Sequence, residues 1–113
     1  MACKTIIYPV RDLETAKAIF TALLGMEPTT DSPYYVGFED GDQQIGLDPN
    51  GHEHGNPGPV PFWHITDIAG RIDALVAAGA TVRQPATEVG GGRTMAILED
   101  ADGNPVGLIE DTV

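Results

Sequence analysis

His64 is the residue whose type and surroundings best suit chemistry, because its imidazole lies in the largely apolar stretch PFWHITDI, just before an expected helix. An imidazole there can ligate a metal ion, or take and give a proton near neutral pH. It can equally be a buried side chain whose two nitrogens are satisfied by neighbouring groups. The stretch leaves these alternatives open. His64 is a candidate general base, and we identify no other candidate catalytic residue in the sequence.

The other two histidines, His52 and His54, form an H-x-H pair within the segment DPNGHEHGNPGPVP. Such a pair can bind a metal ion, but the glycine, proline and asparagine around it cannot continue a strand. The composition therefore predicts a linker over about residues 48–61. Solvent-exposed linker histidines are the favoured interpretation, and metal delivery by this loop is the alternative.

Other reactive motifs are weak. The glycine-rich stretch EVGGGR, ending at Arg93, lacks the GK[ST] of a phosphate-binding loop and leads into an expected strand. The stretch predicts a loop at the rim of a pocket, where Arg93 is either a cation near the mouth or a solvated side chain. Ser32 lacks the flanking glycines of a hydrolase nucleophile, and the single thiol of Cys3 allows neither a CxxC motif nor an internal disulfide.

Composition limits the class of partner. The chain has 113 residues, 42% of them hydrophobic, and a formal net charge of −11. A charge of this sign repels phosphate backbones, so we expect no nucleic-acid partner, whereas cationic ligands stay possible. No apolar run reaches the roughly 18 residues that cross a bilayer, and the start MACKTIIYPV lacks the apolar core of a signal peptide. We therefore expect no membrane partner and a cytoplasmic location.

The elements that must position His64 come in two similar halves. In the first half, residues 5–10 predict a strand, Asp12 can cap the helix that follows, and apolar residues at helical spacing run to Gly25. A short strand is expected near 27–30. Two more strands at 34–38 and 43–47 flank an Asp-Gly turn.

The second half repeats this order. A strand is predicted at 63–66, then a cap at Asp67, a helix whose stripe ends at Gly79, an extended stretch at 81–83, and a hairpin with strands at 94–98 and 105–109. The halves also contain short similar stretches. FED and IGL in the first half correspond to LED and VGL in the second. This self-similarity indicates duplication within a single domain, 1–113, with modules at about 4–50 and 60–112.

Two βαβββ modules, with DLETAKAIF at the first helix and LEDADGNPVGLIED at the end of the chain, resemble the vicinal oxygen chelate superfamily. That superfamily includes glyoxalase I, extradiol dioxygenases, fosfomycin-resistance enzymes and bleomycin-resistance binding proteins. The resemblance implies an α+β fold in which two tandem modules form curved half-barrel sheets around a cavity. It also implies a homodimer, since pairing would cover exposed strand edges.

The resemblance further implies where a metal would be bound. Metal enzymes of the family carry ligands on the first and last strands of each module, which correspond here to Thr5, Gly46, His64 and Gly107. A divalent ion at a catalytic site needs about three protein ligands. Threonine is a poor ligand and glycine has no side chain, so only His64 remains. We therefore expect no metal site and no cofactor.

Strand alternation predicts which side chains share the pocket wall with His64. The predicted pocket residues, with Arg93 at the rim, are Thr5, Ile7, Gln44, Gly46, His64, Thr66, Gly107 and Ile109. A register slip of one residue would exchange the two faces. The two glycines either open volume where the enzymes keep carboxylates or relieve the curvature of each half-barrel.

These observations favour a metal-independent protein that binds a small aromatic or cationic molecule, as the drug-sequestering members of the family do. The alternative is an enzyme, either a glyoxalase-like lyase or isomerase or a dioxygenase, acting on a small substrate that chelates through oxygen. A metal-free enzyme with His64 as its base is a variant of that alternative. A third possibility is a partner subunit whose cavity is vestigial.

Overall fold

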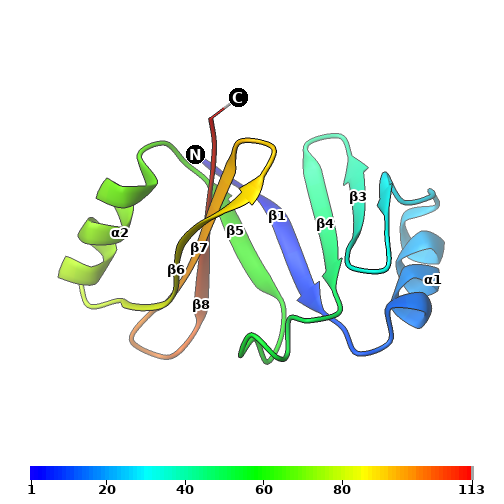
Figure 1. Cartoon of the computed structure of the whole chain (residues 1–113), viewed down its shortest axis with the longest axis horizontal. Helices are drawn as coiled ribbons and strands as arrows, with labels where there is room; N and C mark the ends of the chain where they lie inside the picture. Colours follow the sequence, from blue (N-terminus) through cyan, green and yellow to red (C-terminus); the bar gives the residue numbers. More distant parts are fainter. Residues whose placement is uncertain (113) are drawn as a thin grey trace. The chain divides into compact units, whose positions relative to one another are not determined.

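The computed structural model describes residues 1–112, which form an α+β fold of two compact units (Figure 1). One unit is Lys4–Val60, and the other holds the rest of the described chain. Each unit has the order βαβββ, so the predicted fold class and internal repeat are confirmed.

The unit Lys4–Val60 contains most of β1 (Ala2–Pro9), followed by α1 (Leu13–Leu24), β2 (Thr30–Asp31), β3 (Val36–Asp40) and β4 (Gln43–Asp48). Its strands lie in the order β2-β3-β4-β1, with β1 parallel to β4 and the others antiparallel. The hairpin predicted from the Asp-Gly pair is present between β3 and β4, with Gly41 at φ 62°.

The helix α1 forms as its sequence predicts. The Asp12 side chain accepts a hydrogen bond from the backbone N–H of Thr15, and Gly25 ends the helix at φ 68°. The apolar face of α1 packs on one face of the sheet, around the buried side chains of Val36, Phe38 and Leu47. The opposite face of this sheet therefore carries no helix.

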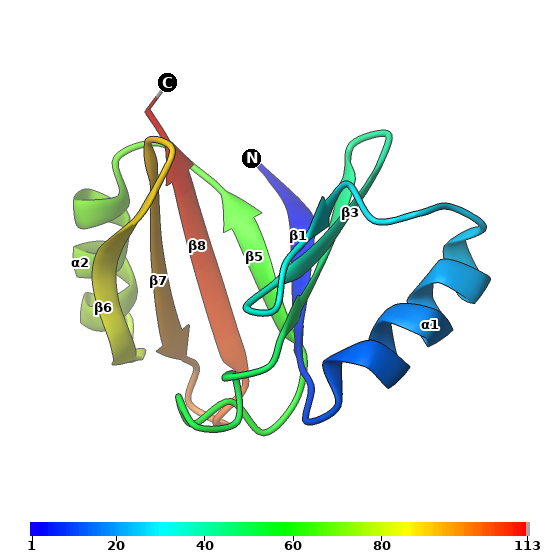
Figure 2. The ribbon, with the colours of Figure 1, turned by 45° about the vertical axis from the view of Figure 1, so that its right-hand side comes forward.

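The second unit contains β5 (Val60–His64), α2 (Ile68–Ala77), β6 (Thr81–Gly90), β7 (Arg93–Glu99) and β8 (Pro105–Asp111). Its strands lie in the order β5-β8-β7-β6, with β5 parallel to β8. Figure 2 shows α2 on one side of this sheet. Between them lies a core of Ile65, Ile68, Ala96, Leu98 and Leu108.

Several boundaries differ from those predicted, among them three in the second unit, which carries His64. The strand expected at 63–66 is β5, which ends at His64, so Thr66 lies in the connection to α2. The extended stretch expected at 81–83 continues as β6 to Gly90, because the glycine-rich stretch forms the turn into β7 with Gly91 at φ 63°. The helix α2 ends at Ala77, two residues before Gly79. No helix in residues 1–112 is long and apolar enough to cross a membrane.

Candidate functional site

The predicted pocket residues of the unit Lys4–Val60 share the helix-free face of its sheet. In the parallel pairing of β1 with β4, Thr5 is opposite Gln44 and Ile7 is opposite Gly46. The neighbours Ile45 and Leu47 pack toward α1, so Gln44 and Gly46 face the other way. Thr5 is 1% exposed, and its hydroxyl donates to Gln44 Oε1 at 3.1 Å.

A tyrosine ring covers Gly46. A Cβ atom built on Gly46 would lie 2.7 Å from Tyr35 Cζ and would overlap the Tyr35 hydroxyl. The same ring lies 3.2 Å from a Cβ built on Gly37, which is directly opposite Gly46 in the β3–β4 pairing. The ring therefore packs across a pair of glycines, and this packing accounts for the absence of side chains there.

The second unit repeats this arrangement with a phenylalanine. Phe62 pairs with Gly107 across β5 and β8, and a Cβ built on Gly107 would overlap Phe62 Cδ1. Phe62 is 2% exposed. The expectation that the two glycines open volume is therefore wrong at the glycines themselves, because an aromatic ring fills the space over each one.

His64 lies on the helix-free face of the second sheet. It pairs with Ile109 in the β5–β8 register, and Leu108, next to Ile109, points into the core under α2. His64 thus shares a face with Ile109 and Gly107, as alternation predicts. Its membership of a ligand pocket stays a prediction.

A carboxylate missed by the sequence reasoning lies beside His64. Asp111 Oδ2 is 3.8 Å from His64 Nδ1. Arg93 holds the same carboxylate with two hydrogen bonds, from Nε to Oδ1 at 2.8 Å and from Nη2 to Oδ2 at 3.0 Å. Arg93 lowers the pKa of Asp111 below its ordinary value, chiefly by hydrogen bonding, and this outweighs the opposing effect of burial.

This pair changes the interpretation of Arg93. The sequence predicted either a cation at the pocket rim or a solvated side chain, and the structure gives its guanidinium a carboxylate partner in the same unit. The pairing follows from the hairpin register, since β7 and β8 place Arg93 directly opposite Asp111. Much of the positive charge of Arg93 is therefore neutralised by Asp111.

The neighbouring acid, Glu110, points to the other face and binds the start of α2. Its carboxylate accepts hydrogen bonds from the backbone N–H groups of Asp67 at 2.7 Å and Ile68 at 3.2 Å. Asp67 adds its own cap by accepting from Gly70 N at 3.2 Å, with its backbone at φ 54°. These contacts satisfy amides that a helix start leaves without partners.

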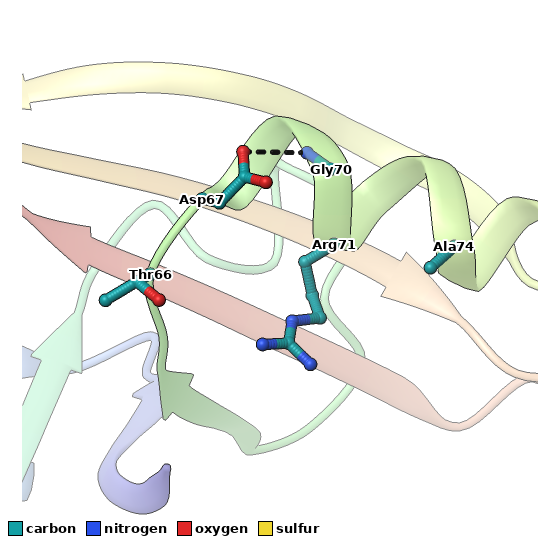
Figure 3. A pocket seen from close by; sticks show the side chains of 5 residues that line it. All are labelled: Thr66, Asp67, Gly70, Arg71 and Ala74. Carbon is teal, nitrogen blue, oxygen red and sulfur yellow. Dashed lines mark hydrogen bonds between the residues drawn. The ribbon is translucent and has the colours of Figure 1, made fainter.

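Thr66 lies in a shallow groove at this helix start. The groove has a volume of about 430 Å³ and is lined by Thr66, Asp67, Gly70, Arg71 and Ala74. Figure 3 shows the hydrogen bond between Asp67 and Gly70, with Arg71 extending from the same turn of α2. Because β5 ends at His64, Thr66 is not carried onto the sheet face by strand alternation. Its predicted role beside His64 stays untested.

The residues at the expected metal positions do not suit a divalent ion. Thr5 offers a hydroxyl that already donates to Gln44, and the two glycines are covered by rings. Across residues 1–112, no three His, Cys, Asp or Glu side chains come together as a metal-binding group. His52 and His54 lie in turns between β4 and β5. A role for these two histidines in metal binding stays a separate prediction.

One protein-family model matches most of the chain. The family model described as the Glyoxalase/Bleomycin resistance protein/Dioxygenase superfamily matches residues 3–108. A search of curated proteins finds no significant match.

Solved structures with a similar fold are distant in sequence. A protein from Legionella pneumophila described as an NAD-dependent benzaldehyde dehydrogenase has a TM-score of 0.76 at 14% identity, covering 96% of this chain and 98% of its own. A Streptomyces coelicolor methylmalonyl-CoA epimerase variant bound to 2-nitronate-propionyl-CoA has a TM-score of 0.73 at 14% identity, with coverages of 98% and 97%. A superfamily member from Vibrio splendidus 12B01 has a TM-score of 0.69 at 15% identity, with coverages of 95% and 97%. At these identities the likeness is one of fold.

Proposed function

This chain belongs to the Glyoxalase/Bleomycin resistance protein/Dioxygenase superfamily, and we propose that within it the protein binds a small molecule without a metal ion. The proposed mode is that of the family's drug-sequestering members. A protein of this fold can bind a small molecule, as the complex of the epimerase with a CoA derivative illustrates. The fold therefore admits a binding function without selecting a ligand.

The pairing of each last-strand glycine with an aromatic ring is the observation that carries this proposal. Gly46 and Gly107 occupy the positions where metal enzymes of the family keep ligands, and the rings of Tyr35 and Phe62 lie over them. A side chain added at either glycine would collide with a ring. A ring thus occupies the space over each of these positions, which suits binding that relies on surface contact and not on a metal ion.

Charge supports a cationic or neutral ligand. The chain carries a formal charge of −11, and Asp111 already neutralises much of the charge of Arg93 on the face that carries His64. A negative field raises the local concentration of cations and lowers that of anions. We expect an aromatic or cationic molecule to bind more tightly than an anionic analogue of the same size.

Metal analysis tests the proposal directly. The purified protein is incubated with Zn²⁺, Ni²⁺, Mn²⁺ or Fe²⁺ under conditions that preserve each ion, desalted, and measured for bound metal and for its melting temperature. We expect no stoichiometric metal and no rise in melting temperature. Stoichiometric metal that is lost in His64→Ala would overturn the proposal. A His52→Ala/His54→Ala variant is the control that separates binding by the linker from binding at His64.

Ligand binding can be followed with the protein's own fluorescence. Trp63 is the single tryptophan and is 40% exposed. It adjoins His64 in β5 but pairs with Leu108, so its side chain lies on the opposite face and its emission reports binding through the strand. A library of planar aromatic amines with matched carboxylates is screened by thermal shift, and hits are titrated against Trp63 emission. Saturable binding of cationic members supports the proposal. Binding of the carboxylates alone would contradict the proposed charge preference.

A second candidate is a metal-free enzyme in which His64 acts as the base. The observation that favours it is the carboxylate of Asp111 at 3.8 Å from His64 Nδ1, since such a group can stabilise the imidazolium that forms when the ring takes a proton. Turnover of hemithioacetals or catechols, lost in His64→Ala, would support this candidate. Activity that survives His64→Ala would remove His64 as the base.

A homodimer and a cytoplasmic location complete the proposal, and both come from the sequence and the family resemblance. Sedimentation of the purified protein tests the first, and fluorescent tagging of the full chain in its host tests the second.

A further inference from the structure

Ser32, the one serine of the chain, ties together the turn between β2 and β3. Its hydroxyl donates a hydrogen bond to the Tyr35 carbonyl at 3.1 Å and accepts from the backbone N–H groups of Tyr34 at 3.2 Å and Tyr35 at 3.1 Å. The N–H of Ser32 donates to the same Tyr35 carbonyl at 3.1 Å. A serine hydroxyl has one proton and two acceptor lone pairs, so the turn uses its full capacity.

The turn fixes the backbone of Tyr35, whose ring reaches over the next two strands. β2 and β3 pair on either side of the turn, with Asp31 opposite Val36. Cε2 of the Tyr35 ring is 3.2 Å from a Cβ built on Gly37, and Cζ is 2.7 Å from a Cβ built on Gly46. These two glycines are directly opposite each other. One side of the ring therefore packs on the backbone of β3 and β4.

The surroundings of this ring favour a positively charged ligand. Phe38 is buried under α1, so its neighbours Gly37 and Glu39 face the helix-free side of the sheet. Tyr35 is partly exposed, and Glu39 is exposed. The π-electrons of an aromatic ring attract a cation over its face, and a carboxylate on the same side of the sheet adds to this attraction. An anion of the same shape would be repelled by both groups.

We infer that Ser32 is a positioning residue, which holds the Tyr35 ring over Gly37 and Gly46, and that the other side of the ring binds an alkylated ammonium group. The inference rests on the proposed function, since it names a side chain that the proposed cationic ligand contacts. The contact uses the ring and not the hydroxyl, so phenylalanine can replace tyrosine. The ligand class narrows to alkylated amines, because a strongly hydrated cation must lose more water to reach a ring.

Nuclear Overhauser effects test the positioning role without any ligand. In the wild type we expect cross-peaks from the ring protons of Tyr35 to the α-protons of Gly37 and Gly46. Ser32→Ala removes the three hydroxyl hydrogen bonds and should weaken these cross-peaks, whereas Ser32→Thr keeps a hydroxyl and should restore them. Thr87→Ala is the control, because it removes a hydroxyl that donates to a nearby backbone carbonyl in the other unit. Cross-peaks of wild-type strength in folded Ser32→Ala would refute the positioning role.

Titration with phenyltrimethylammonium tests the contact, and benzoate is its anionic counterpart. The amide signals of Gly37 and Gly46 are followed in each titration. We expect saturable shifts with the cation and none with benzoate. Tyr35→Leu and Ser32→Ala should weaken binding of the cation between about 3-fold and 30-fold, whereas Tyr35→Phe and Ser32→Thr should stay within about twofold of the wild type.

Tyr34→Leu is the matched control, because Tyr34 adjoins Tyr35 and is 76% exposed. It removes an aromatic ring from the same turn and should bind the cation as the wild type does. The absence of saturable shifts in the wild type would overturn the inferred contact. Equal affinities of Tyr35→Leu and Tyr34→Leu would overturn it as well.

These results can be separated from the metal test. If a metal ion binds at His64 while binding of the cation still depends on Tyr35, the metal-independent function fails and the contact with Tyr35 stands. If no metal binds and the cation changes Trp63 emission without shifting the two glycine signals, the binding function stands and the contact with Tyr35 fails.

Discussion

Replacing Gly107 by alanine tests whether the Phe62 ring excludes a side chain from this position of β8. The new Cβ would overlap Phe62 Cδ1 and lie 2.7 Å from Cε1 and Cγ, all well inside van der Waals contact. Phe62 is 2% exposed, so its ring has little space into which it can move. Either the ring or the β5–β8 pairing must shift.

Two opposing effects set the magnitude. Overpacking a buried site by one methyl group costs about 1–3 kcal/mol of unfolding free energy. Alanine also lowers the conformational entropy of the unfolded chain relative to glycine. Where the folded backbone accepts alanine, this raises the free energy of unfolding by roughly 0.5–1 kcal/mol. The steric cost exceeds the entropic gain, so we expect Gly107→Ala to lose about 1–2 kcal/mol. For a domain of this size that lowers the melting temperature by roughly 4–10 °C.

Urea denaturation followed by circular dichroism gives the free energies. Gly58→Ala is the matched control, because a Cβ at Gly58 meets nothing within 4 Å and should be neutral or slightly stabilising. In a Phe62→Leu background the added methyl group has more room, so the cost of Gly107→Ala should shrink by about 1 kcal/mol or more. A Gly107→Ala variant as stable as Gly58→Ala would refute the claim that the ring excludes a side chain there.

Two further predictions concern the acids at the end of β8. Because Arg93 lowers the folded-state pKa of Asp111 below its ordinary 3.8, the pair stabilises the fold above that value and loses its effect as the pH falls through the lowered pKa. Arg93→Gln should cost up to about 1 kcal/mol at pH 7, and its melting temperature should converge with that of the wild type in acid; a constant gap would contradict this. Glu110→Ala leaves the amides of Asp67 and Ile68 without their acceptor and should cost about 0.5–2 kcal/mol, with faster hydrogen exchange at both amides. Glu88→Ala, on exposed β6, serves as its control.

Local features of the sequence predicted the elements well, because a few neighbouring residues determine them. Asp12 and Gly25 bound α1 as expected, since a cap and a left-handed residue act on the adjacent turn alone. The end of β5 was predicted two residues late, at Thr66. The hydrophobic pattern of the sequence cannot show that the carboxylate of Glu110, which is distant in sequence, accepts hydrogen bonds from the amides that follow Thr66.

Contacts at the site were harder to predict, because they join residues that are distant in the sequence. The pairing of Arg93 with Asp111 could have been found from the hairpin register. Where Glu99 pairs with Pro105, counting back along β7 and forward along β8 by the same number of residues reaches Arg93 and Asp111. No such count leads to Tyr35 over Gly46. Tyr35 precedes β3, and its ring reaches Gly46 across the neighbouring Gly37. A glycine in a strand shows that something approaches the backbone, without showing what approaches.

The two ring–glycine pairs bear on whether these strands can carry a metal ligand. At both sites a Cβ atom on the glycine would overlap the ring, so the position of the ring depends on the glycine. A single Gly107→Glu substitution would add a carboxylate that must first displace Phe62, and the same holds for Gly46 and Tyr35. A carboxylate at either glycine therefore requires a second change at the ring that covers it. Because of this coupling, the rings of Tyr35 and Phe62 are part of the fold in each module. We expect His64, with Asp111 beside it, to be a polar group that contacts the ligand.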